Sequence, residues 1–315
     1  MEQLDKKDIA ILQELDKNVR ASYAQIGRKT KISKETVQYR LKNLEKKKII
    51  TSYWIIPKLG NKSYLYKVLF KNKNMAKEEH EKFIHFLMNH KAISWIASTE
   101  GNWDYIITSI VSADHQFSIM MNELLALFGS KFKEKHVIKG TDLISLNEKY
   151  LYTDSKEIIV RHNSLLEDSP FQDKKDKDLI NALAKDGRIS FREIAEKMNL
   201  TPEAVAYRFK NLMKNVILTI KPRVNHALLG FAYYHLYLEL NEPGMYKKIA
   251  SYYSSHPRCV FIMQYIGICD MHLELVLNPK DTHTIIDELI AHFGNYLNGY
   301  ELIKIVKEHR ISIQQ

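Results

Sequence analysis

Two runs of polar and basic side chains along the chain have the types and spacing that contact with nucleic acid requires. Amide, hydroxyl and carboxylate groups hydrogen-bond base edges in a major groove, and Lys or Arg neutralises phosphates. The first run contains Ser33, Lys34, Glu35, Gln38, Tyr39, Arg40, Lys42 and Lys46. The second contains Thr201, Glu203, Tyr207, Arg208, Lys210 and Lys214. The sequence therefore predicts two candidate DNA-binding surfaces.

Each run lies on a segment with helical periodicity. At about 100° per residue, Val37, Leu41 and Leu44 fall on one side of the first segment, facing a core, and most of the polar side chains fall on the other. Arg40 and Arg208 lie beside the apolar side, so two roles stay open for them: a phosphate contact or an ion pair inside the domain. A plain solvated helix face is the alternative for both segments.

The chain repeats itself, and the repeat weakens that alternative. Residues 20–51 align with residues 188–219 without a gap, and 14 of these 32 positions are identical, including a Glu, a Tyr and two Lys of the polar face. Residues 17–48 contain 11 Lys or Arg against 2 Glu, a net charge of +9, and residues 185–216 contain 7 against 4 acidic residues, a net charge of +3. We therefore expect the first surface to bind a polyanion more strongly.

The segments around the polar runs predict a helix-turn-helix in each repeat. Leu4 to Leu15 has helical spacing, Ser22 with Gln25 forms a capping box, and Thr201 followed by Pro202 begins the last helix of the second copy. The β-rich stretches 49–56 and 216–220 come next, and we interpret them as wing strands. Each head is thus expected to be a winged helix-turn-helix domain.

The remainder of each repeat predicts a ferredoxin-like domain. The first copy has expected strands at 64–71, 93–99, 103–112 and 132–148, with helices at 76–90 and 114–128; the second copy has the same βαββαβ order from 231 to 307. The fold class is α+β. We expect heads at 1–60 and 175–228, tails at 61–153 and 229–315, and a linker at 154–174 with Asp168-Ser169-Pro170 as its exposed part.

Composition restricts the class of protein. The 315 residues include 45% hydrophobic residues and carry a net charge of +10, which permits a polyanionic partner. No apolar stretch approaches the roughly 20 residues of a membrane span, and the charged N-terminus shows no secretory signal, so a cytoplasmic protein is expected. Cys259 and Cys269 are expected to be core residues, and neither a metal site nor a cofactor is predicted. No phosphate-binding Gly loop or nucleophile elbow is present.

The pattern resembles the Lrp/AsnC (feast/famine) family of transcription regulators. The resemblance rests on Arg20-Ala21-Ser22-Tyr23 and Arg40-Leu41 in the first head, on Leu200 to Val205 in the second, and on the turn Thr99 to Asp104 in the tail. It implies winged DNA-binding heads and tails that pair with each other. It also implies an amino acid or similar effector near Thr99, Gly101, Asn102, Asp104, Gly267 and Asp270, although a Gly there also suits a plain hairpin turn.

This chain departs from the family pattern in three respects. Tyr265 replaces the Thr of the second turn, and Lys48 and Val216 replace the Gly that usually precedes the strand. Family members usually have one unit per chain, so this chain is expected to imitate a dimer with its two tails paired internally, or to form a homo-oligomer. Two alternatives to a regulator stay open: a sensor or scaffold that does not bind DNA, and an enzyme like the siroheme decarboxylases, which resemble the family in fold.

Overall fold

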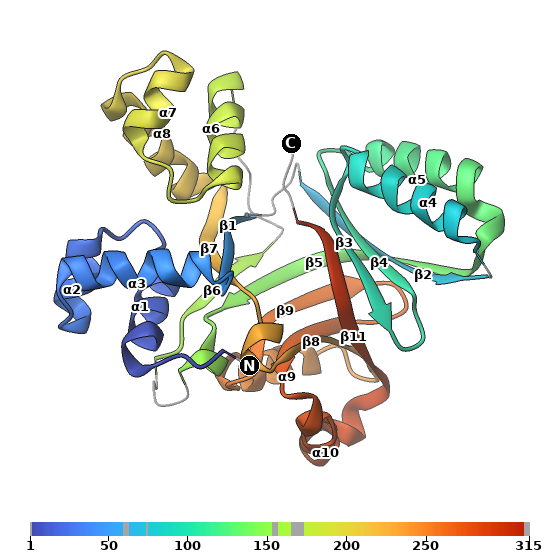
Figure 1. Cartoon of the computed structure of the whole chain (residues 1–315). Coiled ribbons are helices and arrows are strands. Elements are labelled where there is room, and N and C mark those ends of the chain that lie inside the picture. The colour runs from blue at the N-terminus through green and yellow to red at the C-terminus, as the bar shows by residue number, and fades with distance from the viewer. Residues whose placement is uncertain (1, 59–62, 74, 153–156, 165–172, 312–315) are drawn as a thin grey trace.

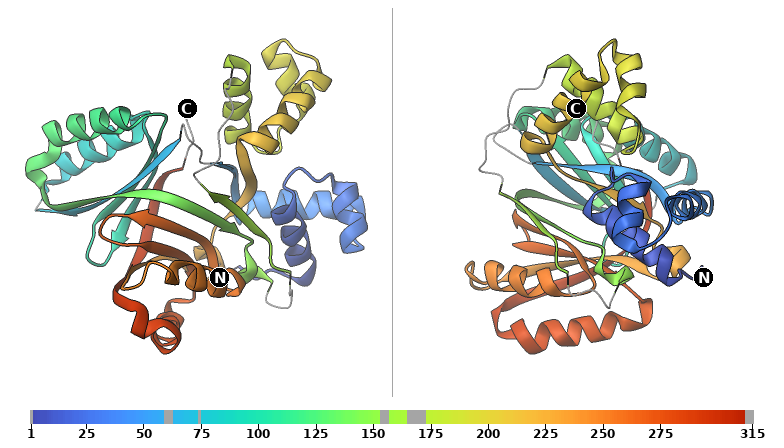
Figure 2. Two further views of the ribbon diagram at one scale, coloured as in Figure 1. Left: turned by 180° about the vertical axis from the view of Figure 1, so that it is seen from behind. Right: turned by 90° about the vertical axis from the view of Figure 1, so that its left-hand side faces the viewer.

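The two heads are three-helix units on the same side of the molecule (Figures 1 and 2). The computed structural model describes residues 2–58, 63–73, 75–152, 157–164 and 173–311. The predicted caps are present: Ser22 Oγ accepts from Gln25 N, and Thr201 Oγ1 accepts from Ala204 N. The head helices are α1 (Lys6–Lys17), α2 (Tyr23–Thr30) and α3 (Lys34–Lys46), then α6 (Lys174–Lys185), α7 (Phe191–Met198) and α8 (Pro202–Asn215).

The strand after each head is present, but it does not form a wing within its own head. Strand β1 (Ile50–Pro57) pairs in an antiparallel manner with β7 (Ile217–Val224) of the other repeat. Each head supplies only one strand, whose backbone groups need partners, and the equivalent strand of the other repeat provides them. The expected wings are therefore corrected to one shared two-stranded sheet, and the two heads share one hydrophobic core.

The tails have the predicted βαββαβ order. Their strands lie in the orders β5-β2-β4-β3 and β11-β8-β10-β9. The first tail consists of β2 (Tyr64–Asn72), α4 (Lys77–Asn89), β3 (Ile93–Glu100), β4 (Tyr105–Val111), α5 (Asp114–Phe128) and β5 (Phe132–Leu146). The second consists of β8 (Ala232–Leu240), α9 (Met245–Ser255), β9 (Cys259–Ile266), β10 (Met271–Leu277), α10 (Thr282–Phe293) and β11 (Leu297–Ile311). Short 3-10 helices lie at Gly129–Lys131, Lys149–Leu151, Ala227–Leu229, Pro279–Asp281 and Gly294–Tyr296.

The two tails pair inside one chain and close into a barrel. Strand β3 pairs with β11, and β5 pairs with both β9 and β2, so that eight strands form a ring. Helices α4 and α5 cover the outer face of the first tail, and α9 and α10 cover that of the second (Figure 1). Alternate residues of the strands point inward, because successive side chains of a strand face opposite sides. A homo-oligomer stays a prediction.

The expected linker is shorter than the sequence suggested. Strand β6 (Val160–Ser164) pairs with residues Asp142–Leu146 of β5, beyond the part of β5 that pairs with β2, and α6 already begins at Lys174. Asp168-Ser169-Pro170 lies outside the described residues. Within the described ranges, no helix is both long enough and apolar enough to cross a membrane.

Candidate functional site

The outer faces of α3 and α8 are the candidate DNA-binding surface. Tyr39 is 71% exposed and its equivalent Tyr207 is 68% exposed, although both are large aromatic residues. The four lysines of the face are exposed, and none makes an ion pair with another described residue: Lys42, Lys46, Lys210 and Lys214. Four basic groups without a counter-charge and two exposed rings suit a polyanionic partner.

The remaining predicted residues of these faces lie at or near the helix N-termini. Lys34, Glu35 and Glu203 are exposed, and Gln38 is half-buried. Ser33 and Thr201 cap the helices, with Ser33 Oγ accepting from Thr36 N at 3.2 Å. Their hydroxyl oxygens are thus engaged by the backbone.

Arg40 and Arg208 form ion pairs inside their own heads, which is one of the two roles that the sequence left open. Arg40 Nη1 donates to Asp5 Oδ2 at 2.6 Å and to Asp8 Oδ1 at 2.9 Å. Arg208 pairs in the same way with two acidic residues of α6 and its cap. Each Arg therefore joins the third helix of its head to the first, and the ion pairs raise the pKa of both guanidinium groups. This arrangement favours the ion-pair role over a phosphate contact.

The two Gly–Asp turns of the tails are hydrogen-bonded into the strand ends. Asp104 Oδ2 accepts from Asn72 N at 2.7 Å, and Asp270 Oδ2 accepts from Leu240 N at 2.6 Å. Gly101 and Gly267 have φ values of 136° and 147°, which favour Gly. Thr99 Oγ1 donates to a carbonyl of its own turn, and Asn102 is exposed. These contacts suit the plain hairpin role, and effector binding at the turns stays a prediction.

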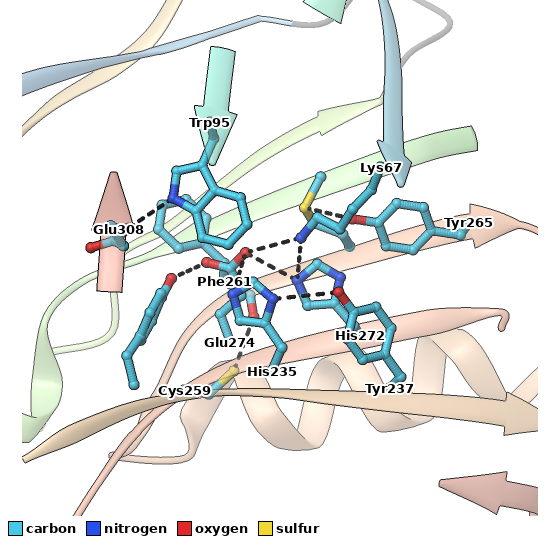
Figure 3. Close-up of polar contacts among 12 residues, drawn as sticks. Lys67, Trp95, His235, Tyr237, Cys259, Phe261, Tyr265, His272, Glu274 and Glu308 are labelled. Atoms are coloured by element: carbon cyan, nitrogen blue, oxygen red, sulfur yellow. Dashed lines mark hydrogen bonds and ion pairs between the residues drawn. The ribbon is translucent and has the colours of Figure 1, made fainter. Parts of the chain in front are cut away.

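The barrel interior contains a buried polar cluster that the sequence did not predict. It consists of Lys67, His235, His272 and Glu274, which come from β2, β8 and β10 (Figure 3). His272 Nε2 lies 3.0 Å from Glu274 Oε1, and the hydroxyl of Tyr233 donates to the same carboxylate. The only local signal was His272 and Glu274 two residues apart on one strand, and only barrel closure adds Lys67 from the other tail.

Burial controls the protonation of the cluster. It lowers the pKa of Lys67 to about 8, although Glu274 opposes this shift. It also lowers the pKa of His272 to about 4 and that of His235 well below its ordinary value. Burial would raise the pKa of Glu274, but the nearby His235, the hydrogen bond from His272 and the Lys67 ammonium together hold it below its usual range. Burial thus favours the neutral form of both imidazoles, and Lys67 and Glu274 form an ion pair at 3.7 Å.

Three of these residues have the composition of a metal site. The ligating atoms of His235, His272 and Glu274 all lie within 4.8 Å of one another. However, Lys67 Nζ lies 3.5 Å from His272 Nε2 and 3.7 Å from Glu274 Oε1, so an ammonium already occupies the neighbourhood that a cation would need. A bound divalent ion would repel this charge at short range.

A cavity of about 140 Å³ adjoins the cluster where β1 and α6 cover one end of the barrel. Its walls are mostly apolar and aromatic, and Lys67 and Glu274 are among its polar groups. Eight-stranded barrels have room for filling side chains or for one small ligand, and barrel mouths are common ligand sites. None of the turn residues predicted for an effector lines this cavity.

Comparison with known proteins finds sequence similarity both to a domain family, in the two heads, and to whole regulators. The AsnC-type helix-turn-helix domain matches residues 4–45 and 173–213. The HTH-type transcriptional regulator LrpB of Bacillus subtilis is 29% identical over 126 residues, which are 39% of this chain and 82% of that protein. The HTH-type transcriptional regulator FL11 of Pyrococcus furiosus is 26% identical over 140 residues, which are 44% of this chain and 91% of that protein. Nearly a whole relative thus matches less than half of this chain.

Two solved structures of one protein, one of them in complex with an iron-uroporphyrin III analogue, are similar over almost the whole chain. The siroheme decarboxylase NirDL superposes with a TM-score of 0.63 over 98% of this chain and 93% of its own, at 12% sequence identity. At this identity the similarity concerns the fold. The arrangement of heads and tails in one chain therefore has a counterpart among known folds.

Proposed function

Because this chain is a tandem-duplicated relative of the Lrp/AsnC transcription regulators, we propose that it binds duplex DNA through α3 and α8 and regulates transcription. The observation that carries the proposal is the repeated outer face of these two helices. Both copies expose a Tyr and two Lys at equivalent positions, and the four ammonium groups lack acidic partners among the described residues. A face needed only for solubility would tolerate change, whereas the Tyr and the two Lys of this face are identical in the two copies.

The shared sheet β1–β7 gives the two heads a fixed mutual orientation. A dimeric helix-turn-helix protein binds two half-sites at a spacing set by its own geometry. The covalent pair of heads would act in the same way, with one difference. Since residues 17–48 carry a net charge of +9 and residues 185–216 a net charge of +3, the first head would contribute more of the phosphate contacts.

The test is a titration of labelled genomic DNA fragments with the full chain, followed by fluorescence anisotropy at several salt concentrations. We expect affinity to fall steeply with salt, and selection of bound fragments to yield a preferred sequence. Binding that is absent, or that does not respond to salt, would contradict the proposal and favour a sensor or scaffold.

Modulation by an amino acid or related small molecule is a second part of the proposal, and the family resemblance supports it. The selection of genomic fragments is therefore repeated with an amino-acid mixture. A change in the bound sequences or in the affinity supports modulation, and identical results with and without the mixture contradict it. Neither outcome affects the conclusion on DNA binding itself.

The fold of NirDL favours one alternative, an enzyme that acts on a tetrapyrrole. Two observations weigh against binding of such a substrate in the barrel cavity. The cavity is about 140 Å³, close to the volume of about 150 Å³ that accommodates benzene, whereas a tetrapyrrole contains four rings. In addition, Lys67 is the one basic residue among the described residues that line the cavity, whereas several basic residues are needed to bind the carboxylates of a tetrapyrrole. A Soret absorption band in purified protein, or after addition of iron-uroporphyrin, would favour the enzyme.

A further inference from the structure

The cavity at the barrel mouth contains a buried cation whose contacts with described acceptors are all long. Only 2% of Lys67 is exposed, and its nearest acceptors among the described residues are His272 Nε2 at 3.5 Å and Glu274 Oε1 at 3.7 Å (Figure 3). A hydrogen bond from an ammonium to a carboxylate is normally about 2.7–2.9 Å long. His272 Nε2 is a poor acceptor as well, because it is 3.0 Å from Glu274 and donates its proton there.

The carboxylates of the lining, in contrast, have donors of their own. Glu274 accepts from Tyr233 and His272. Glu308 accepts from Trp95 Nε1 and from Arg223, each at 2.8 Å. A buried charge with only long hydrogen bonds is poorly stabilised, so Lys67 is the group of this lining that gains most from a ligand acceptor.

The rest of the lining indicates the shape of such a ligand. Trp54, Trp95 and Phe261 provide aromatic walls, and the rings of Trp54 and Phe261 meet edge to face at 5.6 Å between centroids. The volume of about 140 Å³ matches one six-membered ring, since an apolar cavity of about 150 Å³ binds benzene. With Glu274 and Glu308 nearby, a ligand with one negative charge fits the electrostatics better than a dianion.

The duplication makes the site asymmetric. Lys67 and His235 are equivalent residues 168 positions apart, and Thr108 and Glu274 are equivalent residues 166 positions apart. Lys67 pairs across strands with Thr108, and His235 pairs with Glu274. A symmetric homodimer would place the same residue on both sides of the axis, whereas the fused chain places one Lys against one Glu. Among the described residues that line the cavity, Lys67 is therefore the single basic group, with no symmetry-equivalent Lys.

We propose that this cavity binds a small monocyclic aromatic carboxylate, with the carboxylate hydrogen-bonded to Lys67 Nζ and the ring between the aromatic walls. The site is separate from the Gly–Asp turns and does not depend on DNA binding by the heads. Because β1 forms part of the wall and also joins the heads, the ligand would contact the layer that orients them.

The experiment is calorimetric titration of the full chain with three probes of one size: benzoate, neutral benzamide and cationic benzylamine. We expect one benzoate per chain, bound about 10- to 100-fold more tightly than benzamide, as the loss of a charged hydrogen bond implies. Benzylamine is expected not to bind. No benzoate binding to the wild-type chain, or equal affinity for benzoate and benzamide, overturns the proposal.

Two variants locate the site. Lys67→Met keeps an unbranched side chain only one atom shorter and removes the charge, and it is expected to weaken benzoate binding about 10- to 100-fold without affecting benzamide. Ile110→Trp fills the cavity from an uncharged wall position and is expected to abolish binding of both probes. A folded Lys67→Met protein with wild-type benzoate affinity contradicts the proposal. If the Lys67→Met protein does not fold, the Ile110→Trp protein tests the proposal instead. Unchanged benzoate binding to Ile110→Trp would show that benzoate binds outside this cavity and would overturn the proposal.

Discussion

Arg20 and Arg188 occupy equivalent positions in the two repeats, and each donates hydrogen bonds to the backbone of the other head. Arg20 donates to Gly187 O at 2.8 Å and to Ile189 O at 2.9 Å. Arg188 donates to the carbonyls of Val19 and Ala21. Burial lowers the pKa of Arg20, and the nearby Arg188 adds to the shift. The reciprocal contact shows that the two heads are related by a pseudo-twofold axis.

This contact predicts a large loss of stability on removal of either Arg. Arg20→Met leaves two carbonyls of the opposite head without their donor, and we expect the free energy of unfolding to fall by about 2 kcal/mol. The matched control is Arg192→Met, which removes an 85% exposed side chain from an i,i+4 ion pair and is expected to cost less than about 0.5 kcal/mol. Urea unfolding measures both, and equal losses would show that the contact does not stabilise the pair of heads.

DNA affinity should depend on which lysines are removed. The double change Lys42→Ala with Lys46→Ala is expected to weaken binding to all sequences and to lower the salt slope by about 2, because two phosphate contacts are lost. The double change Lys210→Ala with Lys214→Ala acts in the same direction. Lys247→Ala with Lys248→Ala removes the same charge from exposed positions on α9, and this control is expected to leave the slope unchanged. An equal effect of the control would indicate a net-charge effect instead of a defined surface.

The turn after the second helix of each head contains a residue with positive φ, and exchanging the residue types of the two copies tests the effect of this backbone conformation on stability. Lys31 and Asn199 end α2 and α7 at equivalent positions, with φ values of 57° and 50°. The left-handed region is tolerated better by Asn than by Lys. We therefore expect Lys31→Asn to stabilise the protein by about 0.5 kcal/mol and Asn199→Lys to destabilise it by a similar amount, measured by thermal unfolding. Changes of the same sign in both variants would contradict this explanation.

Acid should destabilise the barrel before the carboxylates titrate. Burial lowers the pKa of His272 from 6.5 to about 4, so between these pH values the unfolded chain binds more protons than the folded one. Stability then rises with pH in this window and is lost on acidification, by about 1.4 kcal/mol per pH unit for His272. His235 acts in the same direction, because burial lowers its pKa as well.

Urea unfolding at steps from pH 6.5 to pH 4 measures this slope. His272→Gln is expected to reduce the slope of the unfolding free energy against pH by about 1.4 kcal/mol per pH unit, which corresponds to one proton. His283→Gln, which changes an exposed residue of α10, is expected to leave it unchanged. Burial also lowers the pKa of His226, to about 3, so a wild-type slope near zero would indicate that His226, His235 and His272 are all protonated in the folded state.

Most of the local structure was predictable from the sequence. The capping box at Ser22, the Pro after Thr201 and the apolar spacing of Val37, Leu41 and Leu44 are local signals, and the helices begin and pack accordingly. Cys259 and Cys269 are buried, as predicted. The duplication was visible as identical residues, and the two AsnC-type domains match it.

Features that depend on pairing between the repeats were not predictable. The β-rich segment Ile50–Pro57 looks the same whether it forms a wing hairpin or pairs with β7, because strand propensity does not specify a partner. The role of Arg40 was open for a similar reason: its position beside the apolar stripe allowed two roles, and only the positions of Asp5 and Asp8 in α1 and its cap decided between them.

By itself, the sequence determined two AsnC-type heads, two βαββαβ tails and the basic faces of α3 and α8, since each depends on spacing within one segment. The tertiary structure alone decided the closure of eight strands into one barrel and the meeting of Lys67 with Glu274, which are 207 positions apart. The physical reason is that a strand's alternation tells which residues share a face, whereas only strand pairing tells which faces meet.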